Sequence, residues 1–213
     1  RKARESFLND KGVEEMKQAF VVGIGGCSAS GKSTLSNKLE EQLADCRVKV
    51  FHMDKYFREP GERPEVTGIL DGRTYRDDNH PDTMDLDRLH VDVAAARDGG
   101  EIDVILIEGM FILWDQNMAP LLDLKVFVDC DQDERLRRRI SRNLGFGYDL
   151  DDIMDRYVQA VQPRQREYVE PSKWRADIIV NGFRTVEKGP AGVDIVLAWI
   201  LKNVKERQEA ECH

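Results

Sequence analysis

The sequence predicts an α/β fold in which a mostly parallel sheet is enclosed between helices. From about residue 14 onward, short apolar runs alternate with helical patterns, which is typical of βαβ units. The apolar runs are β-branched and nearly continuous, as expected of strands covered on both faces. With 213 residues, the chain is long enough to enclose such a sheet in one domain. We therefore predict a single domain over residues 1–213, with an N-terminal helical extension at 1–18.

The pattern predicts five strands and five helices. We expect the strands at residues 20–24, 48–53, 104–107, 126–128 and 178–180. We expect the helices at residues 32–43, 86–97, 133–143, 150–168 and 193–207. The polar stretch 55–85 is rich in Gly, Pro, Arg and Asp, and a loop of this length in a compact domain is usually functional.

The composition limits the partners that this chain can have. A formal net charge of −8 opposes general binding to nucleic acid or to anionic membranes. No apolar run is long enough to span a bilayer, and the N-terminus is charged from its first residue. The four cysteines show no CxxC pair, which favours a reducing cytoplasm. We expect a cytoplasmic protein with a small-molecule partner, and homo-oligomer formation stays open.

The run GCSASGKS follows the first predicted strand and opens the first predicted helix, which indicates a phosphate-binding P-loop. Glycines let the backbone N–H groups point inward at an anion. Lys32 would reach the β- and γ-phosphates, and the Ser33 hydroxyl would hold Mg²⁺. The alternative is a glycine-rich turn with a surface lysine. The predicted nucleotide-binding residues are Gly26, Cys27, Ser28, Ala29, Ser30, Gly31, Lys32, Ser33 and Thr34.

Two carboxylates follow the next strands, where ligands bind in open α/β sheets. Glu108 ends the apolar run VILIEG, and we predict that it binds Mg²⁺ directly or through water. Asp54 ends the second strand, and we predict that it accepts the proton of an attacking hydroxyl and helps to organise the metal. The alternatives are a capping or surface role for Glu108 and a turn-capping role for Asp54.

The run DERLRRRISRN predicts an arginine-rich helix. Helical spacing places Arg135, Arg138 or Arg139, and Arg142 on one face. These side chains would close over the phosphates as a lid, predicted at residues 135–150, and would exclude water. The lid is expected to bring Arg138 and Arg142 to the nucleotide. The alternative is an ordinary solvated helix face.

The region 54–85 is predicted to bind the acceptor substrate. It combines aromatic rings with hydrogen-bonding groups, which suits a polar organic molecule. The predicted acceptor contacts here are Asp54, Tyr56, Phe57, Asn79 and His80. The alternative is that the aromatic residues are hydrophobic anchors. Outside this region, we expect Trp174, Trp199 and Phe183 to pack in the core.

Several ordered motifs together resemble the uridine kinase and phosphoribulokinase family of P-loop small-molecule kinases. They are GIGGCSASGKST, HMDKYFR, NHPDTMD, VILIEG, RLRRRISR and RYVQAVQPRQREYVEPSKWRADIIV, and they extend over about residues 20–180. The resemblance implies a three-layer P-loop NTPase fold with five parallel strands in the order 2-3-1-4-5 and a mobile lid. It also implies ATP with Mg²⁺ and a sugar or nucleoside hydroxyl as acceptor.

The resemblance assigns roles to particular positions. The family's catalytic aspartate falls on Asp54, beside the P-loop lysine Lys32, and its Mg²⁺-associated glutamate falls on Glu108. Its ribose-contacting acid falls on Asn79, and its substrate-contacting lid arginine falls on Arg139.

Three departures leave the acceptor open. The family's pyrimidine-binding hairpin before the third strand is missing, Asn79 replaces an aspartate, and the lid reads FGY at 146–148 in place of an RGR-like element. We therefore expect a kinase whose acceptor is a nucleoside, nicotinamide riboside or a phosphorylated sugar. A second hypothesis is a nucleotide-binding regulatory module without acceptor phosphorylation. A simple hydrolase is the least expected, because Asp54 and a lid would then be superfluous.

Overall fold

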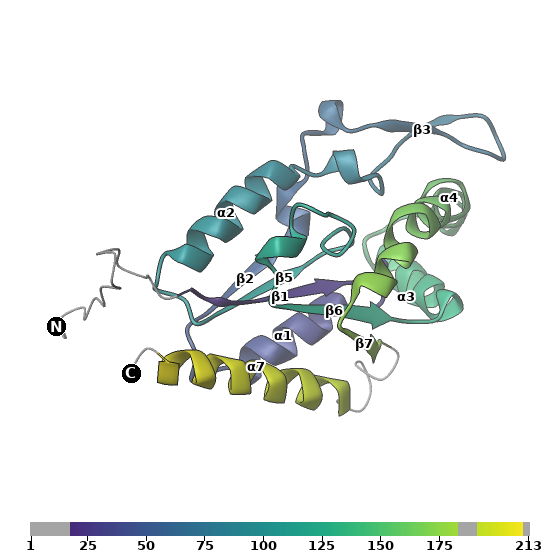
Figure 1. Cartoon of the computed structure of the whole chain (residues 1–213). Coiled ribbons are helices and arrows are strands. Elements are labelled where there is room, and N and C mark those ends of the chain that lie inside the picture. The colour runs from purple at the N-terminus through teal and green to yellow at the C-terminus, as the bar shows by residue number, and fades with distance from the viewer. Residues whose placement is uncertain (1–17, 183–190, 211–213) are drawn as a thin grey trace.

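The computed structural model describes residues 18–182 and 191–210, and its centre is a parallel sheet of five strands (Figure 1). The sheet order is β2-β5-β1-β6-β7. In chain order this arrangement is 2-3-1-4-5, so the predicted order is confirmed. The strands are β1 (Phe20–Gly25), β2 (Val48–His52), β5 (Val104–Glu108), β6 (Leu124–Asp129) and β7 (Ile178–Asn181). The predicted extension at 1–18, apart from Gln18, lies outside the described residues, as do Phe183 and Cys212.

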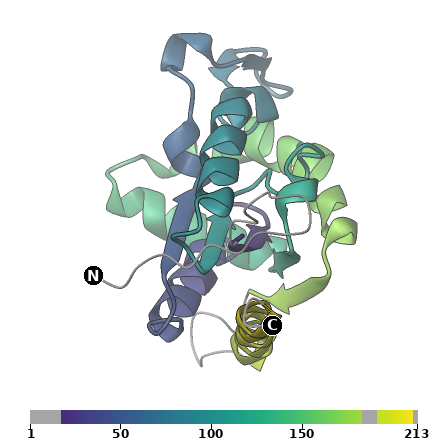
Figure 2. The same cartoon turned by 60° about the vertical axis from the view of Figure 1, so that its left-hand side comes forward.

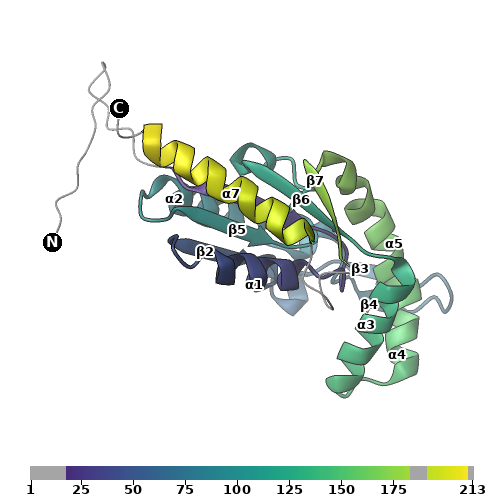
Figure 3. The ribbon, with the colours of Figure 1, turned by 90° about the horizontal axis from the view of Figure 1, so that it is seen from below.

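Helices cover both faces of the sheet, which makes the predicted three layers. On one face lie α1 (Lys32–Gln42) and α7 (Ala191–Ala210), side by side in Figure 3. Figure 2 shows α7 nearly end-on beneath the sheet. On the other face lies α2 (Leu86–Asp98). Because a parallel strand must be reached by a crossover, α1 connects β1 to β2 and α2 lies in the connection from β2 to β5, whereas α7 follows the last strand of the sheet.

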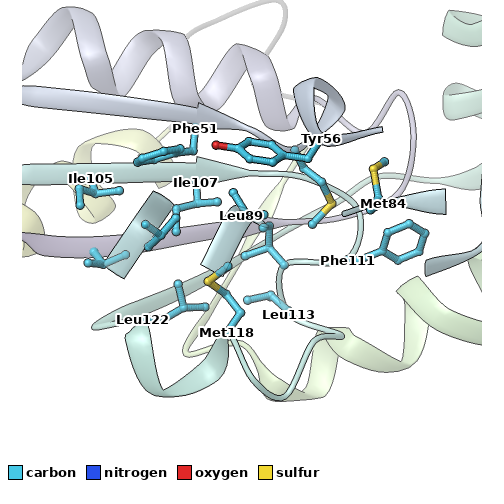
Figure 4. Close-up of a cluster of buried hydrophobic side chains, with 14 of the residues drawn as sticks. Phe51, Tyr56, Met84, Leu89, Ile105, Ile107, Phe111, Leu113, Met118 and Leu122 are labelled. Atoms are coloured by element: carbon cyan, nitrogen blue, oxygen red, sulfur yellow. The ribbon is translucent and has the colours of Figure 1, made fainter. Parts of the chain in front are cut away.

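Two apolar clusters fill the spaces between the layers. Leu35 and Leu39 of α1 pack with Val196 and Ile200 of α7 against one face. Leu89 and Val93 of α2 pack against the other face with a loop that follows β5, as the close-up shows (Figure 4). All residues of β1 and β5 are buried, as predicted. The edge strands β2 and β7 each bury only one residue, so the expectation of two covered faces is wrong for them.

Two predicted core tryptophans are on the surface. The exposed fractions of Trp174 and Trp199 are 81% and 47%. The ammonium of Lys173 lies 5.7 Å from the ring centre of Trp174, and that of Lys202 lies 5.3 Å from the ring centre of Trp199. Aromatic character alone therefore misplaced both residues.

A long helical run lies beside the C-terminal ends of β6 and β7. It begins with α3 (Gln132–Gly145), as predicted for 133–143. After a turn it continues from α4 (Leu150–Arg156) to η6 (Gln165–Val169), which confirms the helix expected at 150–168. The run ends in the 3₁₀ turns of η7 (Glu170–Arg175). Between α4 and η6 it passes through η5 (Tyr157–Val161) and α5 (Gln162–Arg164).

The stretch predicted as a loop at 55–85 contains a small hairpin of its own. Its antiparallel strands are β3 (Glu65–Thr67) and β4 (Thr74–Arg76), which project beyond the sheet in Figure 1. Three 3₁₀ turns flank the hairpin, namely η1 (Met53–Tyr56), η2 (Pro60–Glu62) and η3 (Pro81–Thr83). By contrast, α2 connects to β5 through a short turn, so no hairpin precedes the third strand of the sheet.

Among residues 18–182 and 191–210, none of the helices combines the length and the apolar character that a membrane span needs.

Candidate active site

The carboxyl ends of three neighbouring strands bring the predicted site residues to one edge of the sheet. His52 of β2 and Ile24 of β1 are both register partners of Glu108 in β5. The P-loop, Asp54 and Glu108 therefore meet where ligands bind in sheets of this type. A cavity of about 470 Å³ opens at this edge. Its lining residues are Ser28, Ala29, Gly31, Lys32, Ser33, Thr34, Asp54, Phe57, Asp78, Asn79, Glu108, Met110, Arg138, Arg139 and Arg142.

The P-loop has the backbone that an anion cradle needs. Ala29 and Gly31 both have positive φ, at 63° and 108°, and α1 begins directly after Gly31. At Gly26, a Cβ would come within 2.6 Å of the Val128 carbonyl oxygen, so only glycine fits against β6 there. The turn therefore directs the N-terminus of α1, with its partial positive charge, at the cavity.

Lys32 lies at the base of this cradle with only 8% of its surface exposed. Its Nζ donates a hydrogen bond to the carbonyl oxygen of Cys27 at 2.9 Å. Burial lowers the pKa of Lys32, while the negative charges of Glu108 and Asp54 partly oppose that shift. A buried ammonium whose hydrogen-bond acceptor among residues 18–182 and 191–210 is a carbonyl oxygen is prepared to receive an anionic ligand.

Ser33 and Glu108 place oxygen atoms side by side at the start of α1. Ser33 Oγ donates to Glu108 Oε2 at 3.2 Å, and His52 Nδ1 lies 2.9 Å from Glu108 Oε1. A hydroxyl and a buried carboxylate are the kind of ligands that Mg²⁺ takes alongside phosphate oxygens and water. The donor set therefore fits Mg²⁺. Sequence reasoning did not assign His52, although its place at the end of β2 beside Glu108 follows from the predicted sheet.

Asp54 reaches the same cavity from η1, directly after β2. Burial raises the pKa of Asp54, and the nearby charge of Glu108 raises it further, whereas Lys32 acts in the opposite direction. Gly109 allows the close approach of the two strand ends, since a Cβ there would lie 2.4 Å from Met53 Cβ. A carboxyl group with a raised pKa in a cleft is the pattern of a proton acceptor.

The arginines of α3 divide between the cavity and the protein interior. Arg138 donates to Glu134 and lies 3.3–3.4 Å from the carbonyl oxygens of Ser30 and Gly182. Arg139 lines the cavity, and its buried Nε has no hydrogen-bond partner in the described chain. Burial lowers the pKa of Arg139, and neighbouring Arg142 lowers it further. A half-buried guanidinium whose Nε lacks a hydrogen-bond partner among the described residues favours the binding of an anion.

Arg135 does not join this group. Its guanidinium is buried and donates to Gln165 at 2.7 Å and to Glu170 at 2.9 Å. The prediction that Arg135 belongs to the phosphate-facing set is therefore wrong. Helical spacing could not separate Arg135 from its neighbours, because its hydrogen-bond acceptors lie 30 and 35 positions further along the chain and only the fold brings them close.

The acceptor region contributes Phe57, Asp78 and Asn79 to the cavity wall. Asp78 is one of the hydrogen-bonding groups noted in this region from the sequence, but it was not among the predicted acceptor contacts. Its carboxylate accepts hydrogen bonds from Arg63 at 2.9 Å and from Arg76 at 2.7 and 3.0 Å. This end of the cavity therefore presents an amide, a carboxylate and an aromatic ring.

Tyr56 and His80 are not brought into the cavity wall. Tyr56 is buried in the core, and its hydroxyl donates to Asp92 at 2.8 Å. His80 caps the turn of η3 and packs edge-on against Tyr168 at 5.1 Å. Because both side chains are engaged elsewhere, the structure does not bring them to the other predicted acceptor residues, and their contact with the acceptor stays a prediction. Gly26, Cys27 and Ser30 lie behind the cavity as parts of the P-loop turn.

The fold and this site together define a P-loop protein of the three-layer α/β class. A family model described as the phosphoribulokinase / uridine kinase family matches residues 90–188. A uridine kinase of Limosilactobacillus reuteri (strain DSM 20016) is 32% identical over 191 residues, which cover 79% of this chain and 85% of that protein. Uridine-cytidine kinase B of Dictyostelium discoideum is 27% identical over 226 residues, which cover 95% of this chain and 89% of that protein.

A solved structure described as a possible uridine kinase from Bacillus stearothermophilus shares the fold. The TM-score is 0.53 at 21% sequence identity, and the match covers 76% of this chain and 88% of that one. The chain belongs to the phosphoribulokinase / uridine kinase family of P-loop kinases.

Proposed function

We propose that the protein is an ATP-dependent kinase that moves the γ-phosphoryl group to a hydroxyl of a nucleoside or sugar-like metabolite. One observation carries the proposal: a single cavity joins the phosphate cradle to the carboxylate of Asp54 and to the polar groups at 78–79. A nucleotide switch needs the cradle alone. A kinase also needs a place where an alcohol lies in line with the terminal phosphate.

In this mechanism, Asp54 acts on the acceptor. Its carboxylate accepts the hydroxyl proton as the oxygen attacks the γ-phosphorus and the bond from that phosphorus to ADP breaks, a role worth on the order of 10² to 10⁴ in rate. A raised pKa suits that role, because it makes the carboxylate a stronger base.

The P-loop and α3 act on the phosphates. Lys32 and the backbone amides of residues 26–34 hold the β- and γ-phosphates, and Arg138, Arg139 and Arg142 face the developing charge. Ser33 and Glu108, with Asp54 beside them, would hold Mg²⁺, which neutralises phosphate charge when bound. Residues 135–150 would close over this end as a lid that excludes water.

At the acceptor end, residues 54–85 would bind the alcohol. Phe57 supplies an apolar surface, and Asn79 supplies an amide that can both donate and accept hydrogen bonds. The family relatives named above are uridine kinases, which supports a nucleoside as acceptor. Nicotinamide riboside or a phosphorylated sugar is the alternative, because no hairpin precedes β5. Assembly into a homo-oligomer and a cytoplasmic location stay predictions from the sequence.

The proposal is tested by screening acceptors for stimulated release of ADP. Purified protein with ATP and Mg²⁺ is given uridine, nicotinamide riboside or ribulose 5-phosphate in turn. We expect one of these compounds to raise ADP release well above the rate with ATP alone. If none does, and nucleotide exchange instead changes affinity for another protein, the regulatory hypothesis replaces the kinase.

A further inference from the structure

Asp77 is a fully buried carboxylate that takes no part in phosphate binding as described above. Its side chain is 0% exposed, and it lies directly before the two polar residues of the cavity wall. Asp77 Oδ2 accepts a hydrogen bond from Arg164 Nε at 2.6 Å, and Oδ1 accepts one from the backbone N–H of Asn79 at 3.1 Å. A carboxylate is costly to bury unless it is paired and hydrogen-bonded, and this one is both.

The partner, Arg164, comes from a distant part of the chain. It lies in α5, 87 positions along from Asp77. A second carboxylate, Glu167, accepts a hydrogen bond from Arg164 Nη1 at 2.6 Å, so the guanidinium is held at both ends. One turn further along, Tyr168 packs edge-on against His80. The helical run from α4 to η6 therefore holds residues 77–80 at two points.

The turn that these contacts fix is the one that faces the acceptor. Asp78 and Asn79 line the cavity, whereas Asp77 and Arg164 do not. Burial alone would raise the pKa of Asp78, but the hydrogen bonds from Arg76 and Arg63 outweigh burial and hold it below its usual value. Asp78 is therefore ionised near neutral pH, and its remaining lone pairs can accept hydrogen bonds from hydroxyl groups.

We propose that Asp77 and Arg164 are positioning residues for the phosphoryl acceptor. The ion pair between buried Asp77 and half-buried Arg164 sets the backbone at residues 77–79 and so aims Asp78 and Asn79 at an acceptor that carries hydroxyl groups. The inference rests on the proposed function, since it assumes that this end of the cavity binds the alcohol. It goes further because it gives Asp77 and Arg164 a role in acceptor binding although the acceptor does not contact them.

The expected signature is a change in acceptor binding that leaves nucleotide binding alone. Within the described chain, the hydrogen bonds of the pair go to Asn79 and Glu167 and not to the P-loop or to the arginines of α3 that line the cavity. Loss of an outer contact that orients a binding group typically weakens the site by about ten- to a hundredfold. We expect the KM for the acceptor to rise by that factor, whereas the KM for ATP changes less than about twofold.

The experiment compares Asp77→Asn, Arg164→Met and the double variant in steady-state kinetics. The acceptor is whichever of uridine, nicotinamide riboside and ribulose 5-phosphate stimulates ADP release most. Arg164→Met leaves the buried carboxylate of Asp77 without its cation, which costs stability, whereas in Asp77→Asn the guanidinium of Arg164 still has Glu167. The double variant removes both charges and keeps the fold testable. Arg166→Met is the matched control, because Arg166 lies on the same helical run and is bound only to Gln132 among described residues.

Hydrogen exchange gives a second readout that does not depend on turnover. We expect the amides of residues 77–80 to exchange faster in the double variant, while the amides of residues 26–34 keep the wild-type rate. The inference is overturned if the double variant has the acceptor KM of the Arg166→Met control, or if the KM for ATP rises as much as that for the acceptor. If no compound stimulates the wild-type protein, the proposed function has failed and the inference falls with it.

Discussion

The two ends of the cavity are built in different ways. The proposed phosphate end is built mainly from one continuous run of strand, turn and helix, to which Glu108 of β5 and the arginines of α3 are added. The proposed acceptor end is assembled from side chains after β2, in the region 54–85, and is braced by a helix from much later in the chain. In our proposal, phosphate binding therefore depends mainly on local backbone geometry, whereas acceptor binding depends on tertiary contacts.

We expect the greatest loss of turnover from a change at Asp54, which lies between the two ends of the cavity. Asp54→Asn keeps the shape of the side chain but removes its basicity, so we expect turnover to fall by on the order of 10² to 10⁴. ATP binding, measured by calorimetry, should persist, because the P-loop is intact. Asp152→Asn, an exposed change on α4, is the control. Full turnover by Asp54→Asn would remove this residue from the role of base.

A change at the phosphate end should lower turnover and weaken ATP binding without changing the affinity for the acceptor. Lys32→Met removes a buried cation, and we expect a loss on the order of 10² to 10³ in turnover, with weaker ATP binding as well. The acceptor's own affinity, measured by equilibrium binding without nucleotide, should stay the same. Weakened acceptor binding in that variant would show that the two ends are not separable.

A change at the acceptor end should be smaller and confined to one substrate. Asn79→Ala removes hydrogen bonds between neutral groups, each worth about 0.5–1.5 kcal/mol, so the acceptor KM should rise by roughly three- to tenfold. Asn79→Asp is the matched variant, and its stronger acceptor oxygens should lower the KM for a nucleoside. An unchanged acceptor KM in both variants would mean that Asn79 does not contact the acceptor.

The smallest effect concerns stability. Because the folded protein raises the pKa of Asp54 above its unfolded value, the protonated form is favoured by folding. That favourable contribution is complete below the unfolded pKa and is lost as pH rises through the folded pKa. At pH 7 the ionised group is therefore unfavourable, and Asp54→Asn should raise the Tm of the nucleotide-free protein. The rise should shrink as the pH falls toward 4, which thermal melts across pH will check.

Much of the fold could be predicted because it depends on local patterns. Buried strands such as β1 and long helices such as α3 carry periodic signals over many residues. The hairpin of β3 and β4 was missed, since strands of three residues with mostly exposed side chains have no such signal. Trp174 was misplaced because aromatic character does not say which face of an element is covered.

Predictability of the site residues also depended on whether local patterns or tertiary packing place them. The P-loop, Asp54 and Glu108 could be placed because each follows a strand, and the ends of parallel strands meet. Tyr56 and Arg135 could not, because their partners, Asp92 and Gln165, are brought to them only by packing. For the same reason, no local pattern pointed to the ion pair of Asp77.

In our proposal, the terminal phosphate of ATP and an alcohol meet in one cavity. Following a labelled γ-phosphoryl group from ATP to its product is the most direct test. Protein is incubated with ATP labelled in the γ-phosphoryl group and with the acceptor that best stimulates ADP release. We expect the label to appear in an organic phosphate ester, in an amount equal to the ADP formed. Recovery of all the label as inorganic phosphate would contradict the claim, because water would then be the acceptor.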